Sequence, residues 1–325
     1  MLTRRQTLAR LALTGAAVTG VGLTAACSSD GGDSAGGDSA GGDSAGNGSG
    51  SGGGNGEPLR ISAIPDQDPD ALTEREEAFA AHLAQVLGVD VEYVPVPDYS
   101  ASVSLFGAGD LDLVFYGGLT GVQAQLQNPE AAVVAQRDID PVFTSIFIAN
   151  ADAGIEPLDS VDGLTVFADK RFTFGSETST SGRLMPSYFL SQAGVAEADL
   201  AGEPGFSGSH DSTIELVTSG SYEAGALNSQ VWRSRMEEGT VDTEKVVMVL
   251  ESPEYHDYHW LLRGDVDERF EEGFTQKLTD AMLAMHESEE GLAVVESYGA
   301  EKFIAASRED YQQIEEVARE LGLVG

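Results

Sequence analysis

The sequence at residues 173–182 reads Thr-Phe-Gly-Ser-Glu-Thr-Ser-Thr-Ser-Gly and connects a predicted strand at 164–168 to a predicted helix at 181–193. Ser and Thr are ordinary helix caps, because their oxygens accept the free backbone N–H groups of the first turn. The four small residues at 179–182 supply more N–H groups and hydroxyls than one cap needs. Since N–H groups converge at a helix N-terminus, this stretch predicts an anion-binding turn built around Ser179, Thr180 and Ser181.

Strand and helix patterns alternate on both sides of this turn. The predicted strands are 59–64, 91–96, 111–116, 132–136, 144–149, 164–168 and 246–250. The predicted helices are 72–87, 181–193, 211–219, 270–288 and 311–321. Alternation of this kind is typical of α/β layers with mostly parallel sheets. Short crossovers at 148–150 and 251–258 would divide such a chain into two lobes.

Composition excludes one class of partner. The chain has 325 residues with 18 Lys and Arg against 54 Asp and Glu, for a formal charge of −36. No basic stripe is present to displace phosphate counterions, so a nucleic-acid partner is not expected. Apolar residues make up 41% of the sequence, which suffices for a core in residues 58–325. The acid excess is typical of a solvated surface and does not prevent local dipoles from holding a buried anion.

The N-terminus carries export signals. Residues 1–27 join an Arg-rich start to a short apolar stretch that ends in Leu-Thr-Ala-Ala-Cys. This ending resembles a bacterial lipobox, in which Cys27 is lipidated and becomes the mature N-terminus. The Thr-Arg-Arg-Gln-Thr-Leu run at 3–8 resembles a twin-arginine signal, so the export route stays open between that system and the general one. Cys27 is also the single cysteine, which rules out an intrachain disulfide.

A low-complexity segment follows at 28–57. It holds three copies of Gly-Gly-Asp-Ser-Ala and no apolar residue larger than Ala before its last residues, so it has nothing to pack. We expect a flexible linker with a reach of roughly 30 Å. A linker placed directly after a lipidated cysteine would let a folded domain move above the membrane surface while remaining attached to it.

Other polar stretches supply further candidate ligands. His210 lies in Phe-Ser-Gly-Ser-His-Asp-Ser-Thr at 206–213, just before a predicted helix, where it is either an oxyanion donor or an ordinary loop histidine. The histidine spacing fits no zinc pattern, and no metal or cofactor is expected. The nearest catalytic alternative is a hydrolase that uses Ser179, His210 and Asp257, although no nucleophile elbow, P-loop or His-Glu-x-x-His motif occurs.

Taken together, several segments resemble the phosphate/phosphite/phosphonate-binding family of ABC importers. They are Ser-Thr-Ser-Gly at 179–182, the stretch at 206–211, Gly-Ala-Leu-Asn at 225–228 with Val-Trp at 231–232, and Ser-Pro-x-Tyr-x-Asp-Tyr at 252–258. The resemblance covers nearly all of residues 58–325. Five more segments are most similar to the selenate-binding branch: 64–66, 111–118, 136–137, 143–148 and 260–265.

This resemblance implies a type II periplasmic-binding fold, with two α/β lobes of mixed sheets joined by a two-stranded hinge. One lobe would hold 58–148 and 256–325, and the other 149–255. It also implies an exported, monomeric solute-binding protein that is not an enzyme and delivers a small oxyanion to an ABC permease and its ATPase. The ligand-binding residues that it implies are Ser179, Thr180, Ser181, Tyr99, His210 and Asp257, with Tyr116 as a further candidate.

The residue types also bear on which anion is bound. Asn228 stands where an acidic residue would help to bind the amine of an aminophosphonate, so such a ligand ranks low. Selenate and sulfate have no proton to give near neutral pH, whereas phosphite, phosphate and selenite have protonated forms. If Asp257 faces the ligand as a carboxylate, a buried acceptor without a donor would disfavour selenate and sulfate.

Overall fold

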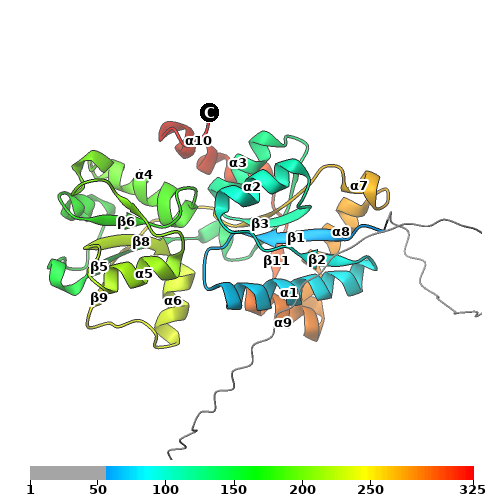
Figure 1. Ribbon diagram of the computed structural model, residues 1–325, viewed down its shortest axis with the longest axis horizontal. Helices are drawn as coiled ribbons and strands as arrows, with labels where there is room; N and C mark the ends of the chain where they lie inside the picture. The colour runs from blue at the N-terminus through cyan, green and yellow to red at the C-terminus, as the bar shows by residue number, and fades with distance from the viewer. Residues whose placement is uncertain (1–55) are drawn as a thin grey trace, which may run out of the picture. The chain divides into compact units, whose positions relative to one another are not determined.

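The computed structural model describes residues 56–325 (Figure 1). The predicted signal peptide, Cys27 and almost all of the predicted linker lie outside the described residues. Within 56–325 the strands form two separate sheets. Figure 1 shows the green-to-yellow middle of the chain gathered around one sheet, and the blue, cyan and orange segments around the other. In this part of the chain no helix has the length and apolar character needed to cross a membrane.

The first sheet has the strand order β11-β4-β10-β3-β1-β2. Its strands are β1 (Leu59–Ala63), β2 (Val91–Tyr93), β3 (Leu113–Tyr116), β4 (Ala132–Arg137), β10 (His259–Leu262) and β11 (Phe303–Ile304). Its helices are α1 (Pro69–Leu87), α2 (Tyr99–Ala108), α3 (Gly118–Gln127), α7 (Val266–Arg269), α8 (Phe274–Leu283), α9 (Glu289–Ser297) and α10 (Gln312–Glu320). In Figure 1, α2 and α3 lie over one face of this sheet, and α1 and α9 over the other. We call this part lobe 1.

The second sheet has the order β7-β6-β8-β5-β9 and forms lobe 2. Its strands are β5 (Ser145–Asn150), β6 (Phe172–Phe174), β7 (Gly205–Phe206), β8 (Ala224–Asn228) and β9 (Val246–Glu251). Its helices are α4 (Met185–Gln192), α5 (His210–Thr218) and α6 (Ser229–Glu237). Helix α4 covers one face of this sheet, while α5 and α6 cover the other (Figure 1).

Both sheets are mixed, so the expectation of mostly parallel sheets from alternation alone was wrong. Strand β5 runs antiparallel to β8 and β9, and β10 runs antiparallel to β3 and β4. The reason lies in the connections. Each of these two strands enters its sheet directly from the other lobe, without the crossover helix that would turn the chain back and make it parallel to its neighbours.

Two short segments carry the chain between the sheets, at 138–144 and 252–258. They pair with each other, because Phe143 and Tyr255 exchange backbone hydrogen bonds of 3.0 and 2.9 Å. This is the two-stranded hinge that the resemblance implied. Strand β5 pairs along its length within the second sheet, so the first crossing precedes the segment expected at 148–150, while the second lies where it was expected. The exact division into lobes at 148 and 256 stays a prediction.

The strand predicted at 164–168 does not form. Val161–Phe167 is instead a short 3₁₀ helix, and β6 lies further along, inside the stretch that was read as the turn. Leu164 and Phe167 are both fully buried, and their three-residue spacing matches the three-residue turn of a 3₁₀ helix. A strand would have placed them on opposite faces, since side chains alternate along it.

Aromatic side chains fill the cores of both lobes. In lobe 1, Phe115 and Trp260 pack with ring centroids 4.3 Å apart, on neighbouring strands. In lobe 2, Phe147 stacks on Phe167 at 5.8 Å, which explains why the 3₁₀ helix docks on this sheet. Local signals set helix boundaries as well. Helix α1 begins after Asp68, whose carboxylate accepts from two backbone N–H groups, and it ends at Gly88 in the left-handed conformation.

Candidate functional site

The Ser/Thr-rich stretch forms a tight turn at the start of a helix. Ser179 is the cap, and its Oγ accepts the N–H of Gly182 at 3.0 Å. A π-turn at Thr180–Leu184 continues into α4, so Thr180 and Ser181 occupy the first turn, where N–H groups have no intrahelical acceptor. All three hydroxyl residues are buried. Their position fits the anion-binding turn that the sequence predicted.

Gly182 is required by close packing inside this turn. A Cβ there would lie 3.0 Å from Ser179 Oγ, 3.1 Å from the Cα of Gly175 and 3.2 Å from His210 Cε1. Because the same Cβ would be close to both Ser179 Oγ and His210 Cε1, the imidazole of His210 lies near the capping hydroxyl. The turn and the histidine therefore share one small volume in lobe 2.

His210 presents a free donor to this volume. It is the first residue of α5 and is fully buried, and burial lowers the pKa of its imidazole below the usual value. Nδ1 accepts the backbone N–H of Asn228 at 3.3 Å, so in the neutral ring the proton is on Nε2. Nε2 has no hydrogen-bond partner within residues 56–325. A buried N–H donor without an acceptor is costly, and an anion oxygen would satisfy it.

Asp257 reaches the same volume from the hinge. Its Oδ1 accepts the N–H of Gly118 at 2.9 Å, at the start of α3. Its Oδ2 has no partner in the described part of the chain. Burial raises the pKa of Asp257 to about 7, partly offset by the Gly118 N–H and by the hydroxyl of Thr180. Near neutral pH this group can therefore either donate a hydrogen bond to an oxyanion or accept one from a protonated ligand.

Tyr99 supplies a third free group from lobe 1. It is the first residue of α2, after Asp98, which caps that helix through a 2.7 Å bond from Ala101. Burial, and then the charge of Asp66, raise the pKa of Tyr99 well above its usual value, and the neighbouring Ser179 hydroxyl offsets part of that rise. Its hydroxyl makes no hydrogen bond of ordinary geometry to other described residues. Tyr99 is thus a neutral donor beside the anion turn.

Direct bonds join the two lobes around these groups. Thr180 Oγ1 accepts the N–H of Leu119 at 2.9 Å, and Thr120 Oγ1 donates to the carbonyl of Thr178 at 2.8 Å. The N–H of His210 donates to the carbonyl of Asp66 at 3.0 Å. The lobes are therefore in contact across the site, where lobe 1, lobe 2 and the hinge each contribute a buried polar atom that has no partner among residues 56–325.

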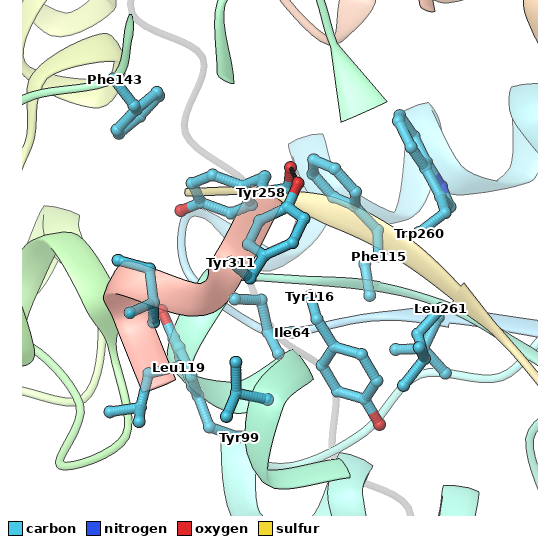
Figure 2. Close-up of a cluster of buried hydrophobic side chains, with 14 of the residues drawn as sticks. Ile64, Tyr99, Phe115, Tyr116, Leu119, Phe143, Tyr258, Trp260, Leu261 and Tyr311 are labelled. Carbon is cyan, nitrogen blue, oxygen red and sulfur yellow. Dashed lines mark hydrogen bonds between the residues drawn. The ribbon is translucent and has the colours of Figure 1, made fainter. Parts of the chain in front are cut away.

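Tyr116 does not join this set. Its hydroxyl donates to the carbonyl of Ser102 at 2.9 Å, and its ring packs on Phe106. Figure 2 shows the hydroxyl directed away from the ring of Tyr258. The loop glycine at 121 has a packing role nearby, since a Cβ there would lie 2.3 Å from the ring of His259. The family resemblance implied Tyr116 as a further candidate, but its side chain points into the lobe 1 core.

The structure does not assemble a Ser–His–Asp relay. A relay needs Asp257 on Nδ1 of His210, yet that nitrogen faces the backbone of Asn228, and Oδ1 of Asp257 faces Gly118. The Ser179 hydroxyl oxygen is occupied by its capping bond. Within residues 56–325, no group of three His, Cys, Asp or Glu side chains is placed to hold a metal ion. The groups present suit binding of an oxyanion and lack a positioned base.

Three residues near the site were not among the sequence candidates. Tyr258 donates to Asp66 Oδ2 at 2.7 Å and accepts from Asn228 Nδ2 at 2.9 Å. In the sequence, Asn228 stands out only because it has no charge for an aminophosphonate amine. Asp66 appears there only within segment 64–66, which is similar to the selenate-binding branch. Asp66 lies three residues after the end of the first strand, a place where α/β proteins often carry ligand-binding groups. This position is the sequence signal that could have identified Asp66.

Comparisons with known proteins identify the family of this chain. The family profile described as "ABC transporter, phosphonate, periplasmic substrate-binding protein" matches residues 61–311. A probable ABC transporter phosphite-binding protein, PhnD1, of Prochlorococcus marinus strain MIT 9301 is 45% identical over 272 residues, 83% of this chain and 92% of that protein. The phosphate-import protein PhnD of Mycolicibacterium smegmatis is 30% identical over 207 residues, 60% of this chain and 63% of that protein.

A solved structure extends the comparison to the fold. The structure of the Prochlorococcus PhnD1 in complex with methylphosphonate superposes with a TM-score of 0.81, covering 83% of this chain and all of that one. The expected fold, two mixed α/β lobes joined by a two-stranded hinge, is confirmed by this match and by the sheet topology. The motif resemblance stated from the sequence is confirmed as well. The finer similarity to the selenate-binding branch stays a prediction.

Proposed function

The chain belongs to the family of ABC-transporter phosphonate periplasmic substrate-binding proteins, and from this membership we propose that it captures a small phosphorus oxyanion such as phosphite or methylphosphonate. The ligand would bind between the lobes and be passed to the permease when the lobes reopen. One observation carries the proposal. Tyr99 Oη, His210 Nε2 and Asp257 Oδ2 are buried polar atoms that have no partner within residues 56–325, and they come from three parts of the fold around the anion turn.

The chemistry of these groups favours an anion that can carry a proton. Tyr99, His210 and the first turn of the helix at 180 are donors, which match oxyanion oxygens. Asp257, with a pKa of about 7, can share one proton with phosphite, phosphate or a phosphonate. Sulfate and selenate bring no proton, so Asp257 must supply it. Phosphorus oxyanions are therefore ranked above sulfate and selenate, with phosphonates of small substituent included.

A thermal-shift panel on the purified protein tests this function. The ligands are phosphite, hypophosphite, methylphosphonate, phosphate, selenite, selenate and sulfate. A ligand present at 100 times its dissociation constant adds about 2.7 kcal/mol to the stability of the folded state. At pH 8, where Asp257 is mostly ionised, we expect a clear rise of the melting temperature with one phosphorus oxyanion and none with sulfate. A panel without any shift would overturn the oxyanion assignment and favour a lipoprotein that only contacts other proteins.

The hydrolase alternative has a separate test. The chain would need to turn over a chromogenic phosphate or carboxylate ester with Ser179 or His210, and we expect no turnover above the uncatalysed rate. The absence of an assembled relay supports this expectation. Turnover that is lost in Ser179→Ala would overturn the assignment as a protein that only binds its ligand.

We also propose that the protein is tethered to the outer face of the cell membrane through a lipid on Cys27 and works there as a monomer. The lipobox-like run and the Gly/Ser/Asp-rich segment that follows support this part of the proposal. Mass spectrometry of the mature N-terminus should find a lipidated cysteine. The substitution Cys27→Ser should release the protein from the membrane fraction without changing its ligand affinity, whereas retention of the variant in membranes would contradict the anchor.

A further inference from the structure

A cavity lies beside the candidate site. It has a volume of about 560 Å³ and is lined by both lobes and the hinge. Among the described residues, its wall includes Asp66, Asn228 and Tyr258 but none of the seven predicted ligand-binding residues. We call this cavity the interlobe cleft. It is large enough for a substituent several carbons long, so whatever separates it from the anion turn would limit ligand size.

Three buried residues stand at the boundary and are hydrogen-bonded to one another. The Tyr258 hydroxyl donates to Asp66 Oδ2 at 2.7 Å and accepts from Asn228 Nδ2 at 2.9 Å. Each of the three is at most 4% exposed. The Tyr258 ring is also fixed from behind, because it stacks on Phe115 with centroids 5.1 Å apart, as seen in Figure 2.

The same three residues contact the anion site on their other side. The Asp66 carbonyl accepts the N–H of His210 at 3.0 Å, and the N–H of Asn228 donates to His210 Nδ1 at 3.3 Å. Tyr258 directly follows Asp257. Asp66 comes from lobe 1, Asn228 from lobe 2 and Tyr258 from the hinge, so the three meet only when the lobes are in contact.

We propose that Asp66, Asn228 and Tyr258 form a partition between the anion site and the interlobe cleft, and that this partition restricts the ligand to oxyanions with no substituent or a very small one. The inference rests on the proposed function and adds its size limit. A longer substituent directed at the cleft would have to break both bonds of Tyr258 and leave the Asp66 carboxylate and the Asn228 amide unpaired.

The partition also defines what an opened site would accept. Asp66 Oδ1 has no hydrogen-bond partner among residues 56–325, and Asp66 lines the cleft together with Arg75, which is paired with Glu76 at 2.9 Å. Once the Tyr258 ring is removed, the added space has polar atoms of both signs at its wall. Substituents that carry an amine should then gain more than purely apolar ones of equal length.

The test compares methylphosphonate with propylphosphonate and 3-aminopropylphosphonate by isothermal titration calorimetry. In the unaltered protein, we expect propylphosphonate to bind at least tenfold more weakly than methylphosphonate. Tyr258→Ala should reduce this ratio of dissociation constants by about tenfold or more. It should also bind 3-aminopropylphosphonate more tightly than propylphosphonate.

A milder variant keeps the proposal testable if Tyr258→Ala does not fold. Asn228 caps α6 and donates to Tyr258 through Nδ2. Asn228→Ser retains a capping oxygen and removes the amide, so it should also reduce the ratio. Asn150 is a matched control, since it too is a cap whose Nδ2 donates elsewhere, to the Val217 carbonyl at 2.8 Å. Asn150→Ser should leave the ratio unchanged.

The outcomes separate the two proposals. If the unaltered protein binds methylphosphonate and the ratio stays the same in both partition variants, the partition is wrong and the function stands. Equal binding of propylphosphonate and methylphosphonate by the unaltered protein also overturns the partition. If the unaltered protein binds none of the phosphorus oxyanions, the proposed function fails and the partition falls with it.

Discussion

Gly118 and Asp257 are 139 positions apart in the sequence, and the N–H of the glycine donates to Oδ1 of the aspartate at 2.9 Å. This bond fixes one carboxylate oxygen, while Oδ2 has no partner among residues 56–325. It also joins the N-terminus of α3 in lobe 1 to the hinge. The protonation state of Asp257 should therefore control which anions the closed site accepts.

Sulfate binding isolates the contribution of Asp257 to anion affinity, because sulfate itself does not titrate between about pH 6 and 9. Burial raises the pKa of this group from 3.8 to about 7, so the favourable protonated form is present at low pH and is lost as the pH rises through about 7. We expect sulfate affinity to fall about tenfold per pH unit above 7. In Asp257→Asn it should be stronger at pH 8 and independent of pH. Isothermal titration calorimetry of sulfate binding across this pH range tests the prediction. Identical pH profiles for the unaltered protein and Asp257→Asn would show that Asp257 does not control sulfate binding.

His210 should act as a neutral donor. His210→Phe removes the Nε2–H and also leaves the Asn228 N–H without its acceptor. A hydrogen bond to a charged group contributes about 1.5–3 kcal/mol, so affinity for a phosphorus oxyanion should fall roughly 10- to 150-fold. Because burial lowers the pKa of this imidazole, the neutral ring should be the form that binds the ligand at pH 7. His82→Phe, on the outer part of α1, is the control. Unchanged affinity in His210→Phe would place this ring outside the site.

Thr120 should contribute to lobe closure without touching the ligand. Thr120→Val keeps the shape of the side chain and removes its bond to the Thr178 carbonyl across the lobes. Loss of about 1 kcal/mol predicts roughly fivefold weaker binding, caused by a less stable closed state. Thr279→Val makes the same change where the hydroxyl bonds only within its own helix, to Thr275. Equal effects of the two variants on affinity would contradict a closure role for Thr120.

Gly117 is placed where a methyl group would hold the lobes apart. Its φ of −71° suits alanine, so Gly117→Ala adds no backbone strain. The new Cβ would lie 3.2 Å from Thr180 Oγ1, which belongs to the opposite lobe, and 3.3 Å from Asp257 Oδ1. We expect an unchanged or slightly raised melting temperature without ligand and about tenfold weaker ligand binding. Gly107→Ala, whose nearest neighbour would be 3.8 Å away, should change neither beyond the small effect of the substitution itself.

The parts of the site that could be predicted from sequence are the local ones. Ser179, Thr180 and Ser181 were recognisable because their cap, first turn and helix are consecutive in the chain. Asp66 and Tyr258 are 192 positions apart, and their bond exists only because strand, hinge and opposite lobe meet. No local pattern encodes such a contact. Tyr116 was implied by the family resemblance, and the burial of its ring against Phe106 decided its direction.

The fold shows the same division between local and long-range information. Helices α2 and α3 were not predicted, because their Ser-, Gly- and Ala-rich sequences hide the apolar face that marks a helix. The antiparallel direction of β5 depends on where the chain crosses between the lobes. The alternation of strands and helices in the sequence does not predict that position. The cap at Asp68 and the stop at Gly88, by contrast, lie within the sequence of α1 itself.

The bonds that join the lobes across the anion site rely on the main chain. The N–H of Leu119, the carbonyl of Thr178, and both partners of the His210–Asp66 bond are backbone groups. Apart from the N–H groups of the first turn at 180, the groups proposed to bind the ligand are on side chains, namely those of Tyr99, His210 and Asp257. Substitutions can therefore change the side chains that determine ligand specificity, while most of the backbone bonds that join the lobes stay the same. A scaffold of this kind can diversify into importers for different anions by a few substitutions, without having to evolve its motion again.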